Sequence, residues 1–407
     1  MQNIQETLLQ LLSLRAQVAD ELYYQQIPPQ YWAQLYKLAS IHRVDTLLAY
    51  QLRKRGLIKF VPPLLARRWD KQILDNSVKN LGLYAELDNI IRVLNRHNII
   101  VIALKGLFLA DKVYKNIGIR RMSDIDILLP DHRIEEAYHL LIDHLGYTIH
   151  GGKSLSLNKG GHIAPLVSPT GIIIELHWTI MLGQNTAEDV VRRAVPVKLL
   201  KSNLLTLDAE DNILYLCKHV AHTHRFGYGG LRAICDIAWA IEYYGMDLNW
   251  DILVVRGRDW GWERIIYLAL AVSERLVGAK VDEKIFAALC DQSSCESMIE
   301  TAVEQLFATE TTGADPVSDN ISSFWQEQGF KNKLAKLFWA VFIPREKMIQ
   351  INQLAPNSWR VYWLYVPRIY NLIKSHTGTL FQLGTGNDQM NAIASRRNAL
   401  AKWMDGV

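Results

Sequence analysis

Long apolar runs are missing from this sequence of 407 residues. The most apolar window covers residues 337–343 and is far shorter than the roughly 20 residues that a membrane-spanning helix needs. The opening residues contain a glutamate and several glutamines, and they lack the basic start and apolar block of a secretory signal. We therefore expect neither a membrane span nor an export signal.

Cysteine is scarce and neither sign of charge is in strong excess. The four cysteines show no CxxC spacing, so we expect no zinc or redox motif and favour a reducing cytoplasm as the location. The net charge of +4 is compatible with a phosphate-bearing ligand but is too weak to indicate a nucleic-acid partner by itself. With 49% hydrophobic and 21% charged residues, the composition is that of an ordinary folded globular chain.

The pattern of apolar residues is mostly helical, with one interruption. Helical spacing is found in residues 31–52, in residues 86–97 and again after about residue 205. Between them, residues 99–104 and 123–130 (SDIDILLP) read as strands, and two more strands flank a turn at residues 168–171, the second being residues 172–178. Asp131, Asp208 and Asn249 are placed to begin helices. The sequence thus predicts an α/β island inside a mostly helical protein.

Four regions follow from this pattern. We expect a helical N-terminal region (residues 1–85), an α/β core (86–180), a helical region that closes the cleft (181–275) and a helical C-terminal region of unknown role (276–407). Residues 150–154 (HGGKS) resemble the end of a phosphate-binding loop, but the required earlier glycine is missing. We therefore interpret them as a turn.

Acidic residues stand out in the predicted strands. Side chains alternate between the two faces of a strand, so Asp124 and Asp126 share one face, about 7 Å apart, and the isoleucines between and after them point into the core. Glu175 and His177 share a face in the same way. If the two strands are neighbours, three carboxylates converge, which suits Mg²⁺. The alternative for such a pair is an exposed strand edge, but an aqueous edge rarely carries so many apolar neighbours.

These motifs resemble a known group of proteins. Residues 103–130 (ALKGLFLADKVYKNIGIRRMSDIDILLP), followed by residues 172–178 (IIIELHW), are similar to the poorly characterised nucleotidyltransferase-like group of the DNA polymerase β superfamily. That group has a Lys-Gly turn, an arginine shortly before an Asp-x-Asp strand, and a later Glu-Leu-His-Trp strand. The similarity extends over roughly residues 30–275. The positions that match are Lys105, Gly106, Arg120, Asp124, Asp126, Glu175 and His177.

The resemblance implies an α+β fold with a minimal polymerase β-like core, in which helices pack on a mixed sheet. It also implies that a nucleoside monophosphate is transferred from a nucleoside triphosphate, with ATP expected, to a hydroxyl-bearing acceptor while pyrophosphate leaves. Mg²⁺ or Mn²⁺ is the expected metal, and a small molecule, peptide or protein is favoured over nucleic acid as acceptor. The implied metal ligands and catalytic residues are Asp124, Asp126 and Glu175, and the implied nucleotide contacts are Lys105, Gly106, Arg120, Ser123 and His177.

One departure from the superfamily keeps alternatives open. Typical members follow the first strand with Gly-Ser or Gly-Gly, whereas this chain has Gly106-Leu107, so we expect Lys105 to supply the missing grip on the phosphates. A nucleotide-binding scaffold or sensor without catalysis, or an enzyme that modifies RNA, are the alternatives. Lys105 can also be a turn lysine, Arg120 a solvated loop charge, and His177 a buried histidine of the core.

Two further groups of residues have simpler interpretations. His219, His222 and His224 lack a convincing third zinc ligand, and lining the acceptor side of the cleft is the better hypothesis. Arg232 and Asp236 are four residues apart in a predicted helix, which favours an ion pair within that helix.

Overall fold

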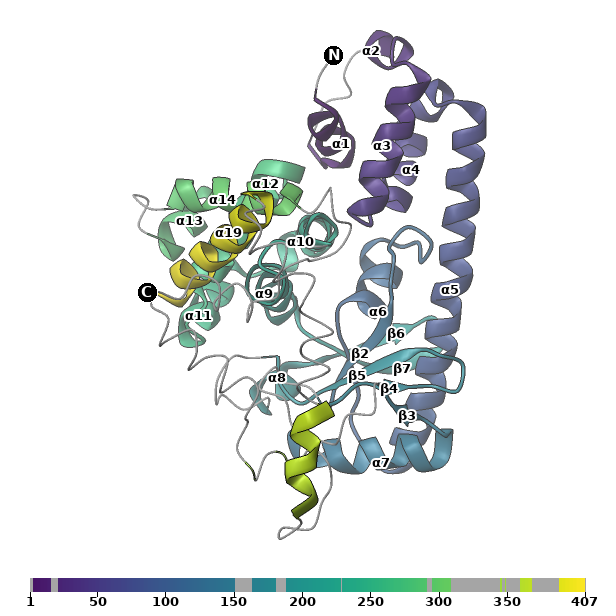
Figure 1. The fold of residues 1–407 in the computed structure, drawn as a ribbon, viewed down its shortest axis with the longest axis vertical. Helices are drawn as coiled ribbons and strands as arrows, with labels where there is room; N and C mark the ends of the chain where they lie inside the picture. Colours follow the sequence, from purple (N-terminus) through teal and green to yellow (C-terminus); the bar gives the residue numbers. More distant parts are fainter. Residues whose placement is uncertain are drawn as a thin grey trace.

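A computed structural model describes residues 3–15, 21–150, 163–180, 188–227, 229–290, 295–308, 345, 348, 359–367 and 388–406 (Figure 1). Helices surround one mixed sheet, so the predicted α+β fold is confirmed. Within these residues no helix is both long and apolar enough to cross a membrane. Residues 151–154 of the predicted turn lie outside the described residues. So does part of the predicted C-terminal region, residues 276–407.

The N-terminal helices lead into a single long helix, α5. Its span of 34 residues, Pro63–Arg96, is far longer than the predicted helix at residues 86–97. The helix starts at Pro63, after Pro62 as its N-cap, because proline at the first helical position lacks only an N–H that has no partner there. The preceding elements are α1 (Ile4–Leu12), α2 (Glu21–Gln25), α3 (Pro29–Ile41), α4 (Asp45–Lys54) and η1 (Leu57–Phe60).

The sheet has seven strands in the order β3-β4-β5-β2-β1-β7-β6. Strand β2 lies in the centre, parallel to β5 and antiparallel to β1, and Asp126 is paired with Glu175. Ile125 and Ile127 are fully buried on the opposite face, as predicted. The strands are β1 (Ile102–Ala103), β2 (Asp124–Leu128), β3 (Thr148–Ile149), β4 (Leu166–Val167), β5 (Ile173–His177), β6 (Val195–Leu199) and β7 (Ser202–Thr206).

The β6–β7 hairpin was not predicted from the sequence. Strand β7 pairs in parallel with β1, so the sheet continues past residue 180, where we expected the α/β core to end. The first strand of the hairpin contains a proline and a lysine and is mostly exposed, which is typical of an edge strand and weakens the alternating pattern.

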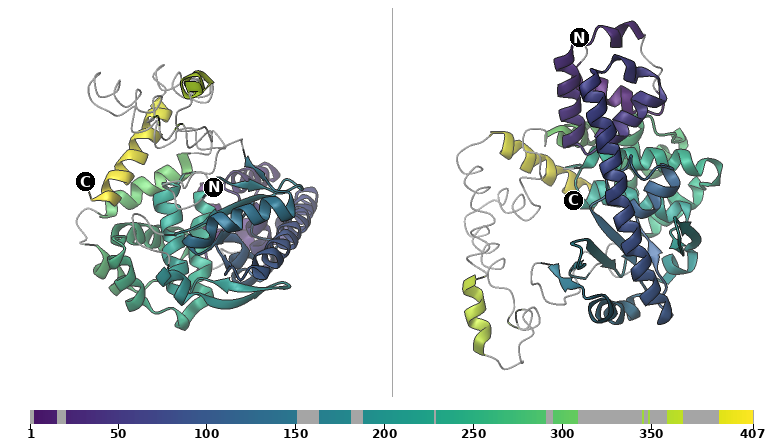
Figure 2. Two further views of the ribbon diagram at one scale, coloured as in Figure 1. Left: turned by 90° about the horizontal axis from the view of Figure 1, so that it is seen from below. Right: turned by 90° about the vertical axis from the view of Figure 1, so that its right-hand side faces the viewer.

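Helices cover the sheet and build a second helical layer beside it. Helix α5 runs past both parts of the molecule, contacting α4 near its start and β2, β7 and α7 further along (Figures 1 and 2). The elements between the strands are α6 (Gly106–Phe108), η2 (Leu109–Val113), η3 (Asp131–Arg133), α7 (Ile134–Leu145) and α8 (Glu188–Arg193). The later ones are α9 (Ala209–Lys218), η5 (His219–Thr223), α10 (Gly230–Tyr244), η6 (Gly245–Asp247), α11 (Trp250–Asp259), α12 (Glu263–Val277), α13 (Glu283–Leu289), α14 (Cys295–Phe307), η9 (Trp359–Leu364) and α19 (Asp388–Asp405).

Two of the three predicted helix starts are confirmed. The Asp208 side chain accepts a hydrogen bond from the Asp211 N–H at the start of α9, and Asn249 accepts one from Ile252 at the start of α11. Asp131 instead begins the short η3 and does not cap α7. Among the cysteines, Cys217 and Cys235 are buried and free, and the remaining two are joined in a disulfide, Cys290–Cys295.

Candidate active site

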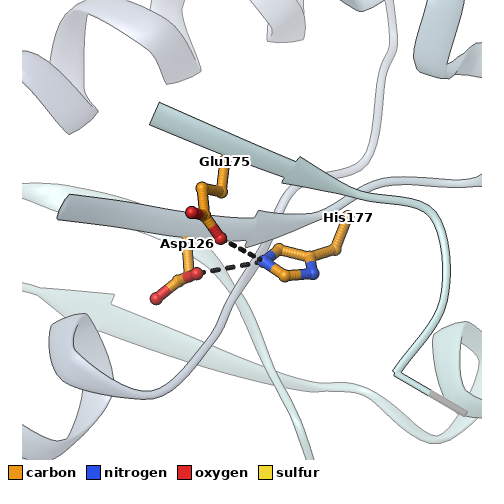
Figure 3. A group of neighbouring side chains, drawn as sticks. All are labelled: Asp126, Glu175 and His177. Atoms are coloured by element: carbon orange, nitrogen blue, oxygen red, sulfur yellow. Dashed lines mark hydrogen bonds and ion pairs between the residues drawn. The ribbon is translucent and has the colours of Figure 1, made fainter. Parts of the chain in front are cut away.

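Strands β2 and β5 bring two carboxylates and an imidazole together on one face of the sheet (Figure 3). His177 Nε2 lies 3.0 Å from Asp126 Oδ1 and 3.6 Å from Glu175 Oε2. One donor atom from each of Asp126, Glu175 and His177 lies within 4.8 Å of the others. Such a spacing is compatible with coordination of one divalent cation. Among the described residues, these three are the group of histidine, cysteine and acidic side chains that shows this spacing.

Asp124 lies at the edge of this group, at the first position of β2. It faces the same side of the strand as Asp126 and lies two residues nearer to the start of the strand. The Ser123 hydroxyl donates to Asp124 Oδ1 at 3.2 Å. Asp126 is only 6% exposed, whereas Asp124 is partly exposed. The structure therefore puts His177 in the tight metal-ligand group and places Asp124 beside it, toward solvent.

The charges at the site are not balanced internally. Burial and the neighbouring Asp126 charge raise the pKa of Asp124 above its ordinary value. Burial acts in the same direction on Asp126, but the Lys105 ammonium and the hydrogen bond with His177 outweigh it and lower the pKa of Asp126. A hydrogen bond with His177 lowers the pKa of Glu175. Three carboxylates thus face one ammonium group, and a bound cation would relieve the excess negative charge.

Lys105 occupies the turn between β1 and α6. Its Nζ lies 3.2 Å from Asp126 Oδ1 and 5.3 Å from the centre of the Tyr215 ring. The Lys105 backbone has a φ of 43°, which is unfavourable for a residue with a side chain. The turn therefore holds Lys105 in this conformation at some energetic cost. Burial opposes the positive charge, but Asp126 more than compensates and raises the pKa of Lys105. Lys105 is accordingly an ammonium in direct contact with the carboxylate cluster.

Helix α9 and the π-helical turn after it contribute further side chains, of which the sequence patterns singled out the histidines but not Lys218. Lys218 Nζ lies 5.9 Å from the Tyr215 ring centre, and burial, together with the Lys105 charge, lowers the pKa of Lys218 to about 8. His219 and His224 contact each other, with their Nε2 atoms 3.1 Å apart. The described residues add no third metal ligand to this pair. The periodicity of α9 alone could not show which of its faces meets Lys105.

Arg120 is held in a buried network away from solvent. Its Nε and Nη2 donate to the two carboxylate oxygens of Asp236 at 2.9 and 2.8 Å, and the Tyr114 hydroxyl donates to the same carboxylate at 2.9 Å. Asp236 therefore pairs with Arg120, and the predicted pair with Arg232 is wrong: Arg232 donates to the Arg121 carbonyl instead. This network fixes α10 to the segment that precedes β2. Both carboxylate oxygens of Asp236 accept hydrogen bonds from the Arg120 guanidinium.

Gly106 has a steric reason to be glycine. A Cβ at this position would lie 2.7 Å from Arg120 Nη1 and 2.9 Å from Met122 Sδ, closer than side-chain atoms normally approach. Helix α5 holds the segment that contains Arg120: the Asn76 and Asn80 side chains both donate to the Arg120 carbonyl. The available sequence signal for this role was a pair of asparagines four residues apart, Asn76 and Asn80.

The predicted site residues therefore fall into two groups. The structure brings Lys105, Asp124, Asp126, Glu175 and His177 to one place, with Ser123 next to Asp124. Arg120 and Gly106 lie behind this place, in the packing that supports it.

Comparison with known proteins agrees with the geometry. A family model described as an uncharacterised nucleotidyltransferase matches residues 28–278, from the start of α3 to the end of α12. No curated protein matches the chain, and neither does any solved structure. The matched segment contains the whole seven-stranded sheet and the carboxylate cluster, and it is more than half of the chain. This protein is a member of the uncharacterised nucleotidyltransferase family, with the α+β core of that family inside a mostly helical chain.

Proposed function

We propose that the protein transfers a nucleoside monophosphate from a nucleoside triphosphate, with ATP as the first donor to test, to a hydroxyl group of an acceptor. The observation that supports this most directly is the register of β2 and β5, which pairs Asp126 with Glu175 and adds Asp124 and His177 on the same face. In a member of a nucleotidyltransferase family, this is the arrangement that metal-assisted phosphoryl chemistry requires.

The donor atoms fit a hard divalent cation. Carboxylate oxygens are the preferred ligands of Mg²⁺ and Mn²⁺, and the residues that would hold the metal are Asp126, Glu175 and Asp124. His177 Nε2 is close enough to serve either as a further ligand or as a hydrogen-bond partner that orients Asp126. When bound, the metal would lower the pKa of the acceptor hydroxyl and neutralise charge on the triphosphate.

The acceptor oxygen forms a bond to the α-phosphorus of the donor, and the bond between that phosphorus and the oxygen bridging to the β-phosphorus breaks. Pyrophosphate leaves, and the hydroxyl proton is released to water. Lys105 is proposed to bind the leaving phosphates, because its ammonium group lies at the carboxylate cluster and offsets developing negative charge.

A second candidate function has one observation in its favour. The Lys105 ammonium and His177 both engage Asp126 Oδ1, so a metal ion would compete with them for this carboxylate oxygen. Together with Gly106-Leu107 in place of Gly-Ser, this favours a nucleotide-binding scaffold or sensor that transfers nothing.

The test is the thermal unfolding midpoint and pyrophosphate release of the wild type and of Asp126→Asn, with each nucleotide and with Mg²⁺ or Mn²⁺. We expect a metal-dependent rise of the wild-type midpoint by linkage, which the variant loses. We also expect pyrophosphate release to fall to about 1% or less of the wild-type rate in the variant.

Asp143→Asn is the matched control, because it removes the same charge at an exposed position of α7. Nucleotide binding that Asp126→Asn abolishes, with no pyrophosphate release for any acceptor in a broad panel, would support the sensor. Release from Asp126→Asn at the wild-type rate would exclude the proposed site.

A further inference from the structure

A basic pocket lies next to the carboxylate site and plays no part in the chemistry proposed above. It is an open pocket of about 430 Å³ between Tyr36 of α3, Arg43, the first half of α5 and the segment that leads into β2. Its basic side chains come from three separate parts of the chain, and they outnumber its acidic ones by five to one. They are Arg43, Arg68, Lys71, Lys79 and Arg121, against Asp75.

The positive charge of this pocket is only partly neutralised. Lys71 pairs with Asp75 at 2.7 Å. Arg121 pairs with Asp45 at 3.2 Å. Among the described residues, the ion pairs at the pocket are these two, and neither includes Arg68 or Lys79; the Arg68 guanidinium lies 4.8 Å from the centre of the Tyr36 ring. Arg68, Lys71 and Lys79 are exposed residues of α5, and with Arg43 and Arg121 they line one concave surface.

The pocket is close to the reacting groups. Arg121 and Met122 line it, and they are followed directly by Ser123 and Asp124 at the start of β2. Arg121 and Asp124 are three positions apart, so their Cα atoms are separated by about 10 Å at most. Burial, and after it the charge of Arg43, lowers the pKa of Lys79, and the Asp124 charge opposes this.

A different set of cations is available to the donor. Lys105 and Lys218 gather around Tyr215 at the sheet end of α9, and Lys105 contacts Asp126 directly. Lys105 lies in the turn before α6 and Lys218 in α9, whereas most basic residues of the pocket lie in α5; in Figure 1, α9 is to the left of α6 and α5 to its right. One nucleoside triphosphate needs one such group, which leaves the pocket on α5 for another anion.

We propose that the basic pocket binds the phosphate group of a small phosphorylated acceptor and thereby presents a hydroxyl of that acceptor to Asp124 and Asp126. This assignment rests on the proposed nucleotidyl transfer. Arginine and lysine are the usual partners of a phosphate monoester, and the volume matches a small-molecule site. A nucleic-acid acceptor is disfavoured because the whole chain carries a net charge of only +4.

The test is calorimetric titration of the metal-free protein, in EDTA, with inorganic phosphate as the probe. We expect Arg68→Gln/Lys79→Gln to bind phosphate about tenfold more weakly than the wild type, because two charged donors are lost. The control Arg67→Gln/Lys37→Gln removes the same charge from exposed positions of α5 and α3 that do not line the pocket. Its phosphate affinity should equal that of the wild type.

Three results would overturn the assignment. They are absence of phosphate binding to the wild type, equal weakening in both double variants, and binding of single-stranded RNA that is far tighter than that of phosphate and falls steeply with salt. Failure of the proposed function is separately visible. Asp124→Asn/Asp126→Asn should lose metal-dependent binding of nucleotide and keep phosphate binding. Arg68→Gln/Lys79→Gln should keep metal-dependent binding of nucleotide and bind phosphate more weakly.

Discussion

Two clusters of buried charge lie at opposite ends of the short segment from Arg120 to Asp126, and they are balanced in different ways. Arg120 meets Asp236 in a two-point ion pair that Tyr114 completes, so this cluster is satisfied by the protein itself. The cluster around Asp126 has the carboxylates of Asp126, Glu175 and Asp124 and one ammonium group, Lys105, which contacts Asp126. The first cluster needs nothing from solution; the second has an excess of negative charge.

This difference indicates which charges hold the fold and which bind ligand. A closed ion pair orients the chain, because removing either partner leaves an unpaired charge in the interior. An open group of like charges costs stability in the absence of its ligand and is retained at sites that bind one. On this basis Arg120 is a positioning residue, and Asp124, Asp126 and Glu175 are the candidates for contact with metal.

Breaking the closed cluster should have the largest effect. We expect Asp236→Ala to lower the free energy of unfolding by about 3–5 kcal/mol, because it leaves the Arg120 guanidinium buried without its partner. Chemical unfolding monitored by circular dichroism measures this. Arg120→Met/Asp236→Leu, which removes both charges, should recover most of the loss. A cost below about 1 kcal/mol for Asp236→Ala would mean that the pair does not hold α10 to the segment before β2.

Gly106 lies between the two clusters and should give an intermediate effect. Gly106→Ala places a Cβ against Arg120 and Met122, so we expect a loss of about 1–3 kcal/mol from overpacking. Gly82→Ala is the control, because Gly82 lies in α5 with no atom within 4 Å of the added Cβ. Alanine there should stabilise the protein by up to about 1 kcal/mol through helix propensity. Equal effects of the two substitutions in thermal unfolding would contradict the close packing around Gly106.

The smallest expected effect has the opposite sign. In EDTA, Asp124→Asn should raise the unfolding free energy by about 0.5–1 kcal/mol, because it removes one charge from a partly buried carboxylate group. With saturating Mg²⁺ or Mn²⁺ the order should reverse, since the wild type then gains metal binding by linkage. Asp143→Asn should show neither effect. An Asp124→Asn variant that is less stable than the wild type in EDTA would show that this cluster, too, is closed.

Much of the site was predictable because its signals are local. The alternation in SDIDILLP and IIIELHW puts each pair of polar side chains on one face of its strand, and the apolar residues between them require burial of the other face. The starts of α9 and α11 were predictable for a similar reason, since the capping side chain and the N–H groups it binds are only a few residues apart.

The elements that were missed depend on distant partners. Helix α5 continues through a polar stretch because Asn76 and Asn80 are buried against the segment before β2, some 40 residues later in the chain. Strand β6 is mostly exposed and owes its conformation to pairing with β7, whose own place is set by β1. Local periodicity carries no information about such contacts.

The sequence by itself thus determined the class of the protein, the two acidic strands and the residues that they carry, because strand alternation and helix capping act within a few residues. Tertiary structure alone decided three further points. It put His177 of β5 beside Asp126 of β2, it paired Arg120 with Asp236 in place of Arg232, and it gathered Arg43, Arg121 and basic side chains of α5 into one pocket. Each of these joins residues from separate elements, and only the packing of those elements fixes which charges meet.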